Sequence, residues 1–193
     1  MSFNNNVWWT RKAKIHHESR LLKLERHSQL LLIWYSFFTL CASILSSSES
    51  TRKIVGMNTS FDPNLLTVFS ILTLIMSCFV ISLNFKERAI KIKNCYEDLA
   101  NLPTLEADAK KRYSEILGRC ENHTEMDYLY AKFNIYYSTD PLNRNNPEYI
   151  DKNITTYEYI KIIINFLSYY FTIISLYLLP ILILIIQFNP IGV

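Results

Sequence analysis

Three long stretches of this 193-residue chain contain no Asp, Glu, Lys or Arg: 27–48, 63–85 and 162–193. A helix needs about 20 residues to cross the ~30 Å hydrocarbon layer of a bilayer, and each stretch exceeds that length. Backbone polar groups cannot stay unpaired in lipid, so uncharged stretches of this length predict membrane-spanning helices. We therefore expect an all-α membrane protein with three transmembrane helices.

The basic residues predict how these helices are oriented. Of the twenty Lys and Arg residues, six precede the first stretch, two lie between the first and second, and twelve lie between the second and third. Lys and Arg near span ends favour the cytoplasmic side, so the N-terminus and the long second connector are predicted inside. The single domain 1–193 is then divided into a basic N-terminal helix 8–27, a first span 28–48, an external loop 49–62, a second span 63–85, a cytosolic helical hairpin 86–137, a loop 138–156 and a third span 159–187.

The third span leaves alternatives open. No charged residue follows it, so it could instead re-enter the membrane or lie against the other spans. Pro180 lies well inside it, and proline in a helix interior predicts either a kink or the end of a half-helix.

An apolar seam follows the second span at alternating spacings of four and three. Its members are Phe85, Ala89, Ile92, Tyr96 and Leu99. This spacing is typical of a helix with one buried face, so we expect the span to continue unbroken into the cytosol. Pro103 interrupts the pattern, and a matching seam then runs through Leu105, Ala109, Tyr113, Ile116 and Cys120. Two seams joined by a short breaker predict an antiparallel helical hairpin extending from the second span.

Each predicted span also has one mildly polar face. The residues on these faces are Ser36, Thr39, Ser43, Ser70, Thr73, Ser77, Asn165, Ser168 and Thr172. Such faces can line a water-filled path, or they can serve close helix packing with hydroxyls bonded to backbone carbonyls. For any single Ser or Thr, packing is the favoured reading. No span centre carries an ionisable residue, which argues against a proton relay, a voltage sensor or a charged-substrate site.

The densest polar cluster runs from Glu121 to Tyr128. Cys120, His123 and Asp127 are spaced to share a helix face and could ligate a metal, but no second ligand cluster exists to complete a site. A hydrogen-bonded helix junction is favoured. The four cysteines, Cys41, Cys78, Cys95 and Cys120, have a spacing that supports neither a disulfide framework nor a zinc knuckle. The chain contains no recognisable catalytic motif, so we expect no enzyme, no metal and no cofactor.

Basic residues beside the spans are expected to face lipid. They are Arg11, Lys12, Lys14, Lys86 and Arg88. Their position next to a span makes contact with anionic lipid a simpler explanation than nucleic-acid binding. The basic helix should run straight into the first span, with Trp8 and Trp9 packing against the hairpin or touching headgroups.

Five segments together resemble a known family. They are Trp9–Lys14, Ser28–Ser36, Asn84–Ala89, Cys95–Leu99 and the Glu-Asn-His-Thr-Glu-Met-Asp-Tyr block at 121–128. The chain resembles the SLATT domains, which associate with SMODS and SLOG proteins, and is most similar to their fifth subgroup over nearly its whole length. The block at 121–128 is the most specific element of this resemblance.

The resemblance implies a membrane effector of a bacterial antiphage defence system. Such a protein would oligomerise with its own copies and form a pore or disrupt the inner membrane, where it would be a multi-pass protein with its N-terminus in the cytoplasm. Cell death or growth arrest would follow when a partner sensor is triggered. The implied partner is encoded nearby and is a reverse transcriptase or a nucleotide second-messenger synthetase. The family is named for two spans, so the third predicted span departs from it.

Two other functions stay open. One is a non-conducting membrane adaptor that recruits or anchors a cytosolic defence enzyme through the hairpin. The hairpin residues expected to make such interactions are Tyr96, Leu99, Glu121, Asn122, His123, Glu125, Asp127 and Tyr128. The other is a membrane-embedded enzyme that uses His123 and Asp127, which is the least favoured reading.

Overall fold

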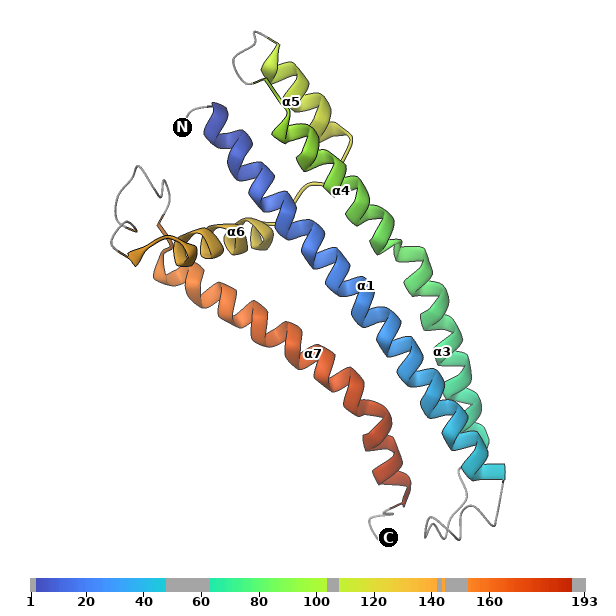
Figure 1. Cartoon of the computed structure of the whole chain (residues 1–193). Coiled ribbons are helices and arrows are strands. Elements are labelled where there is room, and N and C mark those ends of the chain that lie inside the picture. The colour runs from blue at the N-terminus through green and yellow to red at the C-terminus, as the bar shows by residue number, and fades with distance from the viewer. Residues whose placement is uncertain (1–2, 48–62, 104–107, 142–143, 145–152, 189–193) are drawn as a thin grey trace. The chain divides into compact units, whose positions relative to one another are not determined.

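The computed structural model describes residues 3–47, 63–103, 108–141, 144 and 153–188, and the elements it forms there are helices (Figure 1). They are α1 (Phe3–Ser47), α3 (Pro63–Leu83), α4 (Phe85–Ala100), α5 (Ala109–Gly118), α6 (Glu125–Ser138) and α7 (Thr156–Phe188). Three helical stretches are long and apolar enough to cross a membrane, within 3–44, 66–100 and 156–183. The all-α prediction and the three candidate spans are confirmed for these residues, whereas the predicted external loop 49–62 lies outside them.

Contacts divide the chain into two compact units, and each is described by itself. The polar unit consists of Met1–Glu25 and Phe85–Ser168, and the apolar unit of Arg26–Asn84 and Tyr169–Val193. Helices α1 and α7 each contribute a segment to both units. The prediction that the basic N-terminal segment runs as one helix into the first span is confirmed by the 45 residues of α1.

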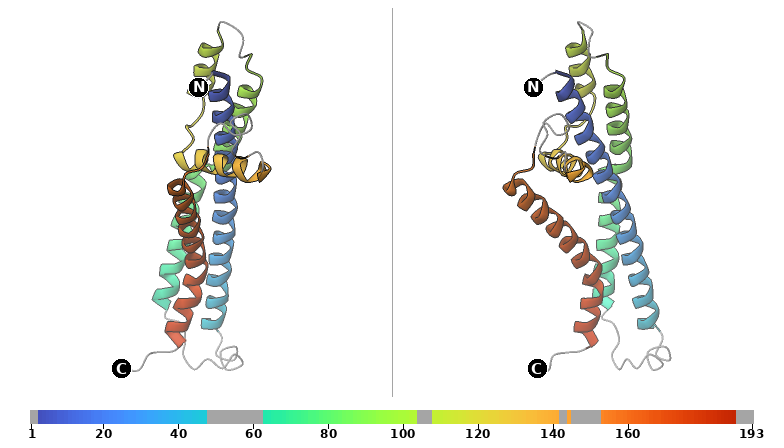
Figure 2. Two further views of the ribbon diagram at one scale, coloured as in Figure 1. Left: turned by 90° about the vertical axis from the view of Figure 1, so that its left-hand side faces the viewer. Right: turned by 60° about the vertical axis from the view of Figure 1, so that its left-hand side comes forward.

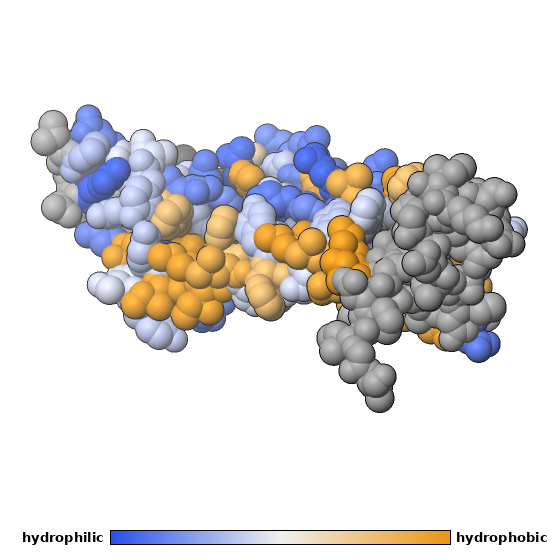
Figure 3. All heavy atoms as spheres, turned by 90° about the horizontal axis from the view of Figure 1, so that it is seen from below, coloured by the Kyte–Doolittle hydropathy of each residue, from blue (hydrophilic) through white to orange (hydrophobic). Residues whose placement is uncertain are grey.

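The apolar unit buries little of its hydrophobic surface. Phe38, Ala42 and Phe69 are buried, and the ring centroids of the two phenylalanines are 5.6 Å apart. Most other large apolar side chains are exposed, including Leu74 at 66% and Phe171 at 74%. Figure 3 shows hydrophobic residues gathered in patches on the face that it presents. Exposed hydrocarbon on this scale is unfavourable in water and favourable in lipid.

The polar unit has an ordinary apolar core. Figures 1 and 2 show α5 folded back beside α4, and the core between them contains Cys95, Leu99 and Leu102. Val7 of α1 packs into the same core. The predicted α4 seam is confirmed at Phe85, Ala89, Ile92 and Leu99, which are all buried, but Cys95 takes the place expected for Tyr96. As predicted from Pro103, α4 ends at Ala100.

The expectation that the second span continues unbroken is wrong. Helix α3 ends at Leu83, and α4 begins at Phe85. Between them, Asn84 has φ 45°, in the left-handed region, and its N–H bonds to the carbonyl of Ile81 at 3.3 Å. Asn enters this region more readily than other side-chain-bearing residues because its short amide can hydrogen-bond locally. The apolar seam did not reveal this break, because it begins at Phe85, directly after Asn84.

The expectation about the cysteines also needs correction. Cys95 on α4 and Cys120, beyond the end of α5, are joined in a disulfide, with Cα atoms 6.4 Å apart and a separation of 25 positions in the sequence. Cys41 and Cys78 are free. The pairing follows from the antiparallel packing of α4 and α5, which sequence spacing alone does not reveal.

Candidate functional site

The polar unit contains a set of charged and polar side chains, three of them buried and three partly exposed, that we call the polar junction. Its members are Lys14, His17, Arg20, Arg88, Glu121 and Asp127, contributed by α1, α4, the connector before α6, and α6 itself.

Lys14 is the most deeply buried cation of the polar junction. Its side chain is 0% exposed, and Nζ donates to Cys120 Sγ at 3.0 Å and to the backbone carbonyl of Glu121. Burial lowers the pKa of Lys14, and the negative charge of Glu121 partly opposes that shift. A buried ammonium without partners would be very costly, so these bonds fix α1 against the connector.

Asp127 is the buried anion of the polar junction. Its side chain is 1% exposed, and its carboxylate accepts from Arg20 Nε at 2.8 Å and Arg20 Nη2 at 3.0 Å. It also closes a capping box with Thr124, whose side chain accepts from the Asp127 N–H while Asp127 accepts from the Thr124 N–H. Burial alone would raise the pKa of Asp127, but the bonds from Arg20 and Thr124 outweigh it and hold that pKa below its usual value. One carboxylate therefore starts α6 and ties it to α1.

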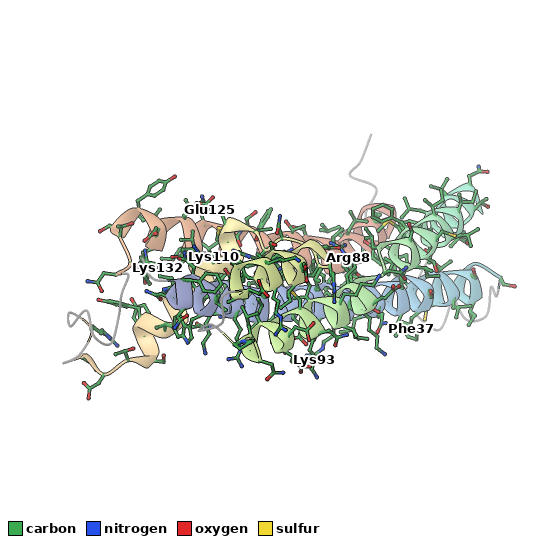
Figure 4. All side chains as sticks on the ribbon, turned by 90° about the horizontal axis from the view of Figure 1, so that it is seen from above. Phe37, Arg88, Lys93, Lys110, Glu125 and Lys132 are labelled. Atoms are coloured by element: carbon green, nitrogen blue, oxygen red, sulfur yellow. A yellow bond between two sulfur atoms is a disulfide. The ribbon has the colours of Figure 1, made fainter. Side chains whose placement is uncertain are left out.

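Glu121 connects the same connector to α4. Its carboxylate accepts from Arg88 Nε at 2.6 Å and Arg88 Nη2 at 2.8 Å, a bidentate pair. Figure 4 labels Arg88 on α4. The bonds from Arg88 lower the pKa of Glu121 and keep it ionised.

Histidines add groups that are neutral when buried. His17 is 2% exposed, and its Nε2 lies 3.9 Å from Glu121 Oε2. Burial lowers the pKa of His17 and of His123, so both are neutral near pH 7. His16 on the same helix lies 3.3 Å from the Asn134 amide nitrogen of α6.

A further bond joins α1 to α4 within the polar unit. Tyr96 donates from its hydroxyl to Glu18 at 2.8 Å. Burial, followed by this contact with Glu18, raises the pKa of Tyr96 to about 12. The phenol therefore stays protonated and keeps its role as a donor.

The bonds of the polar junction link helices and the connector before α6 to one another. Both carboxylate oxygens of Asp127 are taken by Arg20 and Thr124. Cys120, considered above as a metal ligand with His123 and Asp127, is bonded to Cys95. Within the part of the chain that the structure describes, no group of three or more His, Cys, Asp or Glu side chains could hold a metal ion.

The apolar unit has its own polar feature, at Pro180 of α7. Helix α7 continues through this buried proline to Phe188. Proline has no N–H, so the carbonyl of Leu176, four residues earlier, lacks its partner within the helix. Tyr35 of α1 donates its hydroxyl to that carbonyl at 2.9 Å, and Trp34 Nε1 donates to the neighbouring Tyr177 carbonyl at 3.1 Å. We call this set the proline clasp.

The hydrogen bonds of the proline clasp are important because the expected surroundings of these helices are lipid and not water. An unsatisfied carbonyl in hydrocarbon is costly, and hydrophobic burial gives little net attraction between helices in lipid. Two side-chain bonds from α1 to the interrupted backbone of α7 therefore give these helices a specific contact. Of the two outcomes expected from Pro180, the end of a half-helix is not found.

Three hydroxyl groups on the span faces bond to carbonyls of their own helices. Thr39, Ser70 and Thr73 donate to the carbonyl four residues earlier, at 2.8, 2.9 and 2.8 Å. Asn165 accepts from the Tyr130 hydroxyl at 3.3 Å. Thr39, Thr73 and Ser77 are half-buried, and the other six residues of this set are exposed: Ser36, Ser43, Ser70, Asn165, Ser168 and Thr172.

A family model described as "SMODS and SLOG-associating 2TM effector domain family 5" matches residues 1–186. The chain belongs to this family. The resemblance to the fifth SLATT subgroup is thereby confirmed. The comparisons found no match among curated proteins and none among solved structures.

The SLATT chain described here has one more candidate span than the family description states. That description specifies two transmembrane helices, whereas three helical stretches are long and apolar enough. The match continues to residue 186 and so includes nearly all of α7, which ends at Phe188. The third helix is thus part of the family's matched region and is not an appendage to it.

In the sequence block at 121–128 only Asp127 is buried, but several of the partly exposed residues contact other helices. Glu121 and Asp127 belong to the polar junction, Glu125 accepts from Lys161 at 2.7 Å, and the ring of Tyr128 packs 5.6 Å from that of Trp9. Asn122 is exposed and His123 half-buried. Of the other residues expected to interact, Leu99 is buried in the core and Tyr96 bonds to Glu18.

The basic residues expected to face lipid are placed unevenly. Lys14 does not face lipid, because it is fully buried, and Arg88 is paired with Glu121. Lys86 is exposed, while Arg11 and Lys12 are half-buried. Lys12 Nζ lies 5.4 Å from the ring centroid of Trp8. The position of Lys14 in a basic run beside a span suggested contact with lipid, and only its contacts with Cys120 and Glu121 make it internal.

Two features of the site carried signals that the sequence reasoning did not use. Thr124 and Asp127 have the spacing of a capping box, which predicts a helix start. Pro180 predicts a free carbonyl at Leu176, for which a donor such as a tyrosine hydroxyl is needed. Which tyrosine supplies it could not be read from the sequence.

Proposed function

We propose that this SLATT protein is a membrane effector of a bacterial antiphage defence system. Copies of the chain oligomerise and form a pore, or otherwise disrupt the inner membrane, when a partner sensor is triggered. Cell death or growth arrest is the consequence. The observation that supports this most is the joining of three apolar helical stretches to a polar unit held by buried charges, in a chain of an effector family.

The orientation proposed is that of the positive-inside rule. The N-terminus and the polar unit would lie in the cytoplasm, where a partner can reach them. The partner proposed is the product of a neighbouring gene, either a reverse transcriptase or a nucleotide second-messenger synthetase. No role in binding nucleic acid, no cofactor and no catalysis are proposed.

The proposed route to a pore uses the span faces that carry hydroxyl groups. At rest, Thr39, Ser70 and Thr73 satisfy carbonyls of their own helices. Reorganised subunits would turn these faces toward one another around water, for which hydroxyls are suitable lining groups. The proline clasp would be the contact that changes, because losing the bond from Tyr35 leaves the Leu176 carbonyl without a partner within its helix.

The test is membrane potential in cells that carry the chain with its neighbouring genes. Triggering the system should depolarise the inner membrane in the wild type. Replacing Ser36, Thr39 and Ser43 together by Ala or Leu should abolish depolarisation while leaving the amount of membrane protein unchanged. A potential that stays at its resting value during triggering would contradict the proposal.

A second candidate is a non-conducting adaptor that recruits a cytosolic defence enzyme. The observation that favours it is the self-contained core of the polar unit, which could fold as a docking module. An adaptor should tolerate the triple substitution in α1, whereas disrupting the seam at Tyr96 and Leu99 should abolish its function. A pore should be sensitive at both places, so the two sets of variants distinguish the candidates.

A further inference from the structure

Helix α6 and the first turns of α7 share a surface that the polar junction does not use. The rings of Phe133 and Tyr159 have centroids 6.1 Å apart and are nearly parallel, and Phe133 lies 4.5 Å from Tyr137. Tyr136 packs edge-on against Tyr137 at 5.4 Å. The cation of Arg144 lies over both tyrosines, at 5.2 and 5.3 Å from the ring centroids. We call these five residues the aromatic patch.

The contacts between α6 and α7 fix the level of the patch along α7. Lys132 of α6 pairs with Glu158 at 2.7 Å, and Glu125 pairs with Lys161 at 2.7 Å; Figure 4 labels Lys132 and Glu125. Farther along, Tyr130 reaches Asn165 at 3.3 Å. Helix α6 therefore lies against residues 158–165, which span ~10 Å along the helix axis.

That interval is where the charges of α7 end. Lys161 is the last charged residue of the chain, and the uncharged stretch begins at Ile162. In a helix that crosses a bilayer, this transition lies at the headgroup layer, which is roughly 5–8 Å thick on each side. Tyr and Trp side chains are enriched at that depth because one end is apolar and the other polar.

The exposed side chains of α7 also change from polar to apolar near this interval. One exposed row begins with Tyr157 at 73% and continues through Ile160 at 50%, Ile164 at 62% and Leu167 at 60%. These spacings of three and four place the residues on one helix face. Tyr157 is thus the polar end of an exposed apolar row, and Tyr137 of the patch is itself 48% exposed.

Two lysines beside the aromatic patch form ion pairs, whereas Arg144 contacts aromatic rings and backbone carbonyls. Lys132 and Lys161 are neutralised by glutamates. Arg144 instead stacks on two rings and donates to the carbonyls of Thr139 and Tyr137 at 3.2 and 3.4 Å. A guanidinium that lies over tyrosine rings beside exposed apolar residues is suited to the phosphate of an anionic lipid.

We propose that the aromatic patch, with Tyr157, is a phospholipid contact surface that holds α6 in the headgroup layer. The occupant is the lipid interface itself, with Arg144 favouring anionic headgroups. The C-terminal half of α6 then lies at the membrane surface, and Asp127 in its first turn belongs to the polar junction. This placement depends on α7 crossing the membrane and not on whether the assembled protein conducts.

The test uses the full chain in bacterial membranes with a benzophenone amino acid at single positions. Photo-cross-linking from Tyr137 or Tyr157 should give phospholipid adducts, identified by mass, as should Phe171, which is exposed within the span at 74%. Lys110, an exposed residue of α5, is the matched negative control. No lipid adduct at Tyr137 and Tyr157, with Phe171 reacting, would overturn the proposal, and so would cross-links to a second polypeptide.

The role of Arg144 is tested in vesicles that contain phosphatidylglycerol and phosphatidylethanolamine. In the wild type, adducts at Tyr137 should be enriched in the anionic lipid on the order of fivefold, the effect of about one cation at a membrane surface. Arg144→Gln should bring that enrichment close to one while lipid adducts persist. Unchanged enrichment would remove Arg144 from the contact.

Discussion

The polar unit and the apolar unit differ in the hydrogen bonds that connect the helices inside each of them. In the polar unit, charged side chains on α1, α4 and α6 bond across helices, and Lys14 and Asp127 are almost wholly buried. In the apolar unit, Thr39, Ser70 and Thr73 bond within their own helices, and the bonds from Trp34 and Tyr35 to α7 cross between helices. The first pattern is typical of a unit that is surrounded by water, and the second is typical of helices that are surrounded by lipid.

This difference predicts which single substitutions should change the stability of the protein most. In the polar unit, a buried charged group has given up its contact with water. Removing its partner is therefore costly for the stability of the folded state, because the lost hydration is no longer compensated. In lipid, hydrocarbon surrounds both the joined and the separated helices, so stability depends on packing and on a few hydrogen bonds of modest strength. Effects should therefore be large in the polar junction and small in the spans.

The largest effect is expected for Asp127→Ala. It removes the partner of Arg20 and half of the Thr124 capping box, and we expect a loss of about 3 kcal/mol. For a chain of this size, that lowers the unfolding midpoint in detergent by roughly 6–12 °C, measured by circular dichroism. Asp98→Ala, at an exposed position on α4, is the matched control and should change little. Equal midpoints for the two variants would show that the polar junction does not stabilise the unit.

Acid should weaken the polar unit in two stages. Burial lowers the pKa values of His17 and His123 below 6.5, so the unfolded chain binds protons first and stability falls as pH drops through that range. Asp127, whose pKa is held below 3.8, adds a further loss at lower pH.

Denaturant midpoints measured between pH 7.5 and pH 5 should therefore decrease, and the double variant His17→Gln/His123→Gln should show a flatter profile. A wild-type midpoint independent of pH over this range would contradict the assigned burial of the two histidines.

Tyr35→Phe should have a smaller effect, about 1 kcal/mol, because it removes one hydrogen bond in lipid. Pro180→Ala restores an N–H for the Leu176 carbonyl, so in that background Tyr35→Phe should cost distinctly less. The double-mutant cycle is measured by unfolding in mixed micelles. Equal costs in both backgrounds would mean that the tyrosine does not compensate for the proline.

The smallest effect is expected for Ser70→Ala. Its hydroxyl donates only to the Leu66 carbonyl of the same helix, and such bonds add little to helix stability. We expect a change within about 0.5 kcal/mol in the same micelle assay. A loss as large as that of Tyr35→Phe would assign Ser70 to an interhelical contact.

The sequence predicted the parts of the fold that depend on local pattern. Uncharged length predicted the spans, with α7 at Thr156–Phe188 close to the expected 159–187, and Pro103 predicted the end of α4. It missed what depends on distant partners. Lys14 is internal because of groups 106 and 107 positions away, and Cys95 meets Cys120 only because α5 folds back. The break at Asn84 was missed because it lies inside an uncharged stretch and directly before the seam that begins at Phe85.

Native cysteines offer the most direct test that lipid is the solvent of the apolar unit. Cys78 is a free thiol, exposed on the surface of α3. In intact bilayers a charged, water-soluble maleimide should leave Cys78 unmodified, although it should label it fully in SDS, while Lys110→Cys on α5 should react in both. Rapid labelling of Cys78 in the bilayer without any trigger would show that water covers α3, and would contradict its assignment as a membrane span.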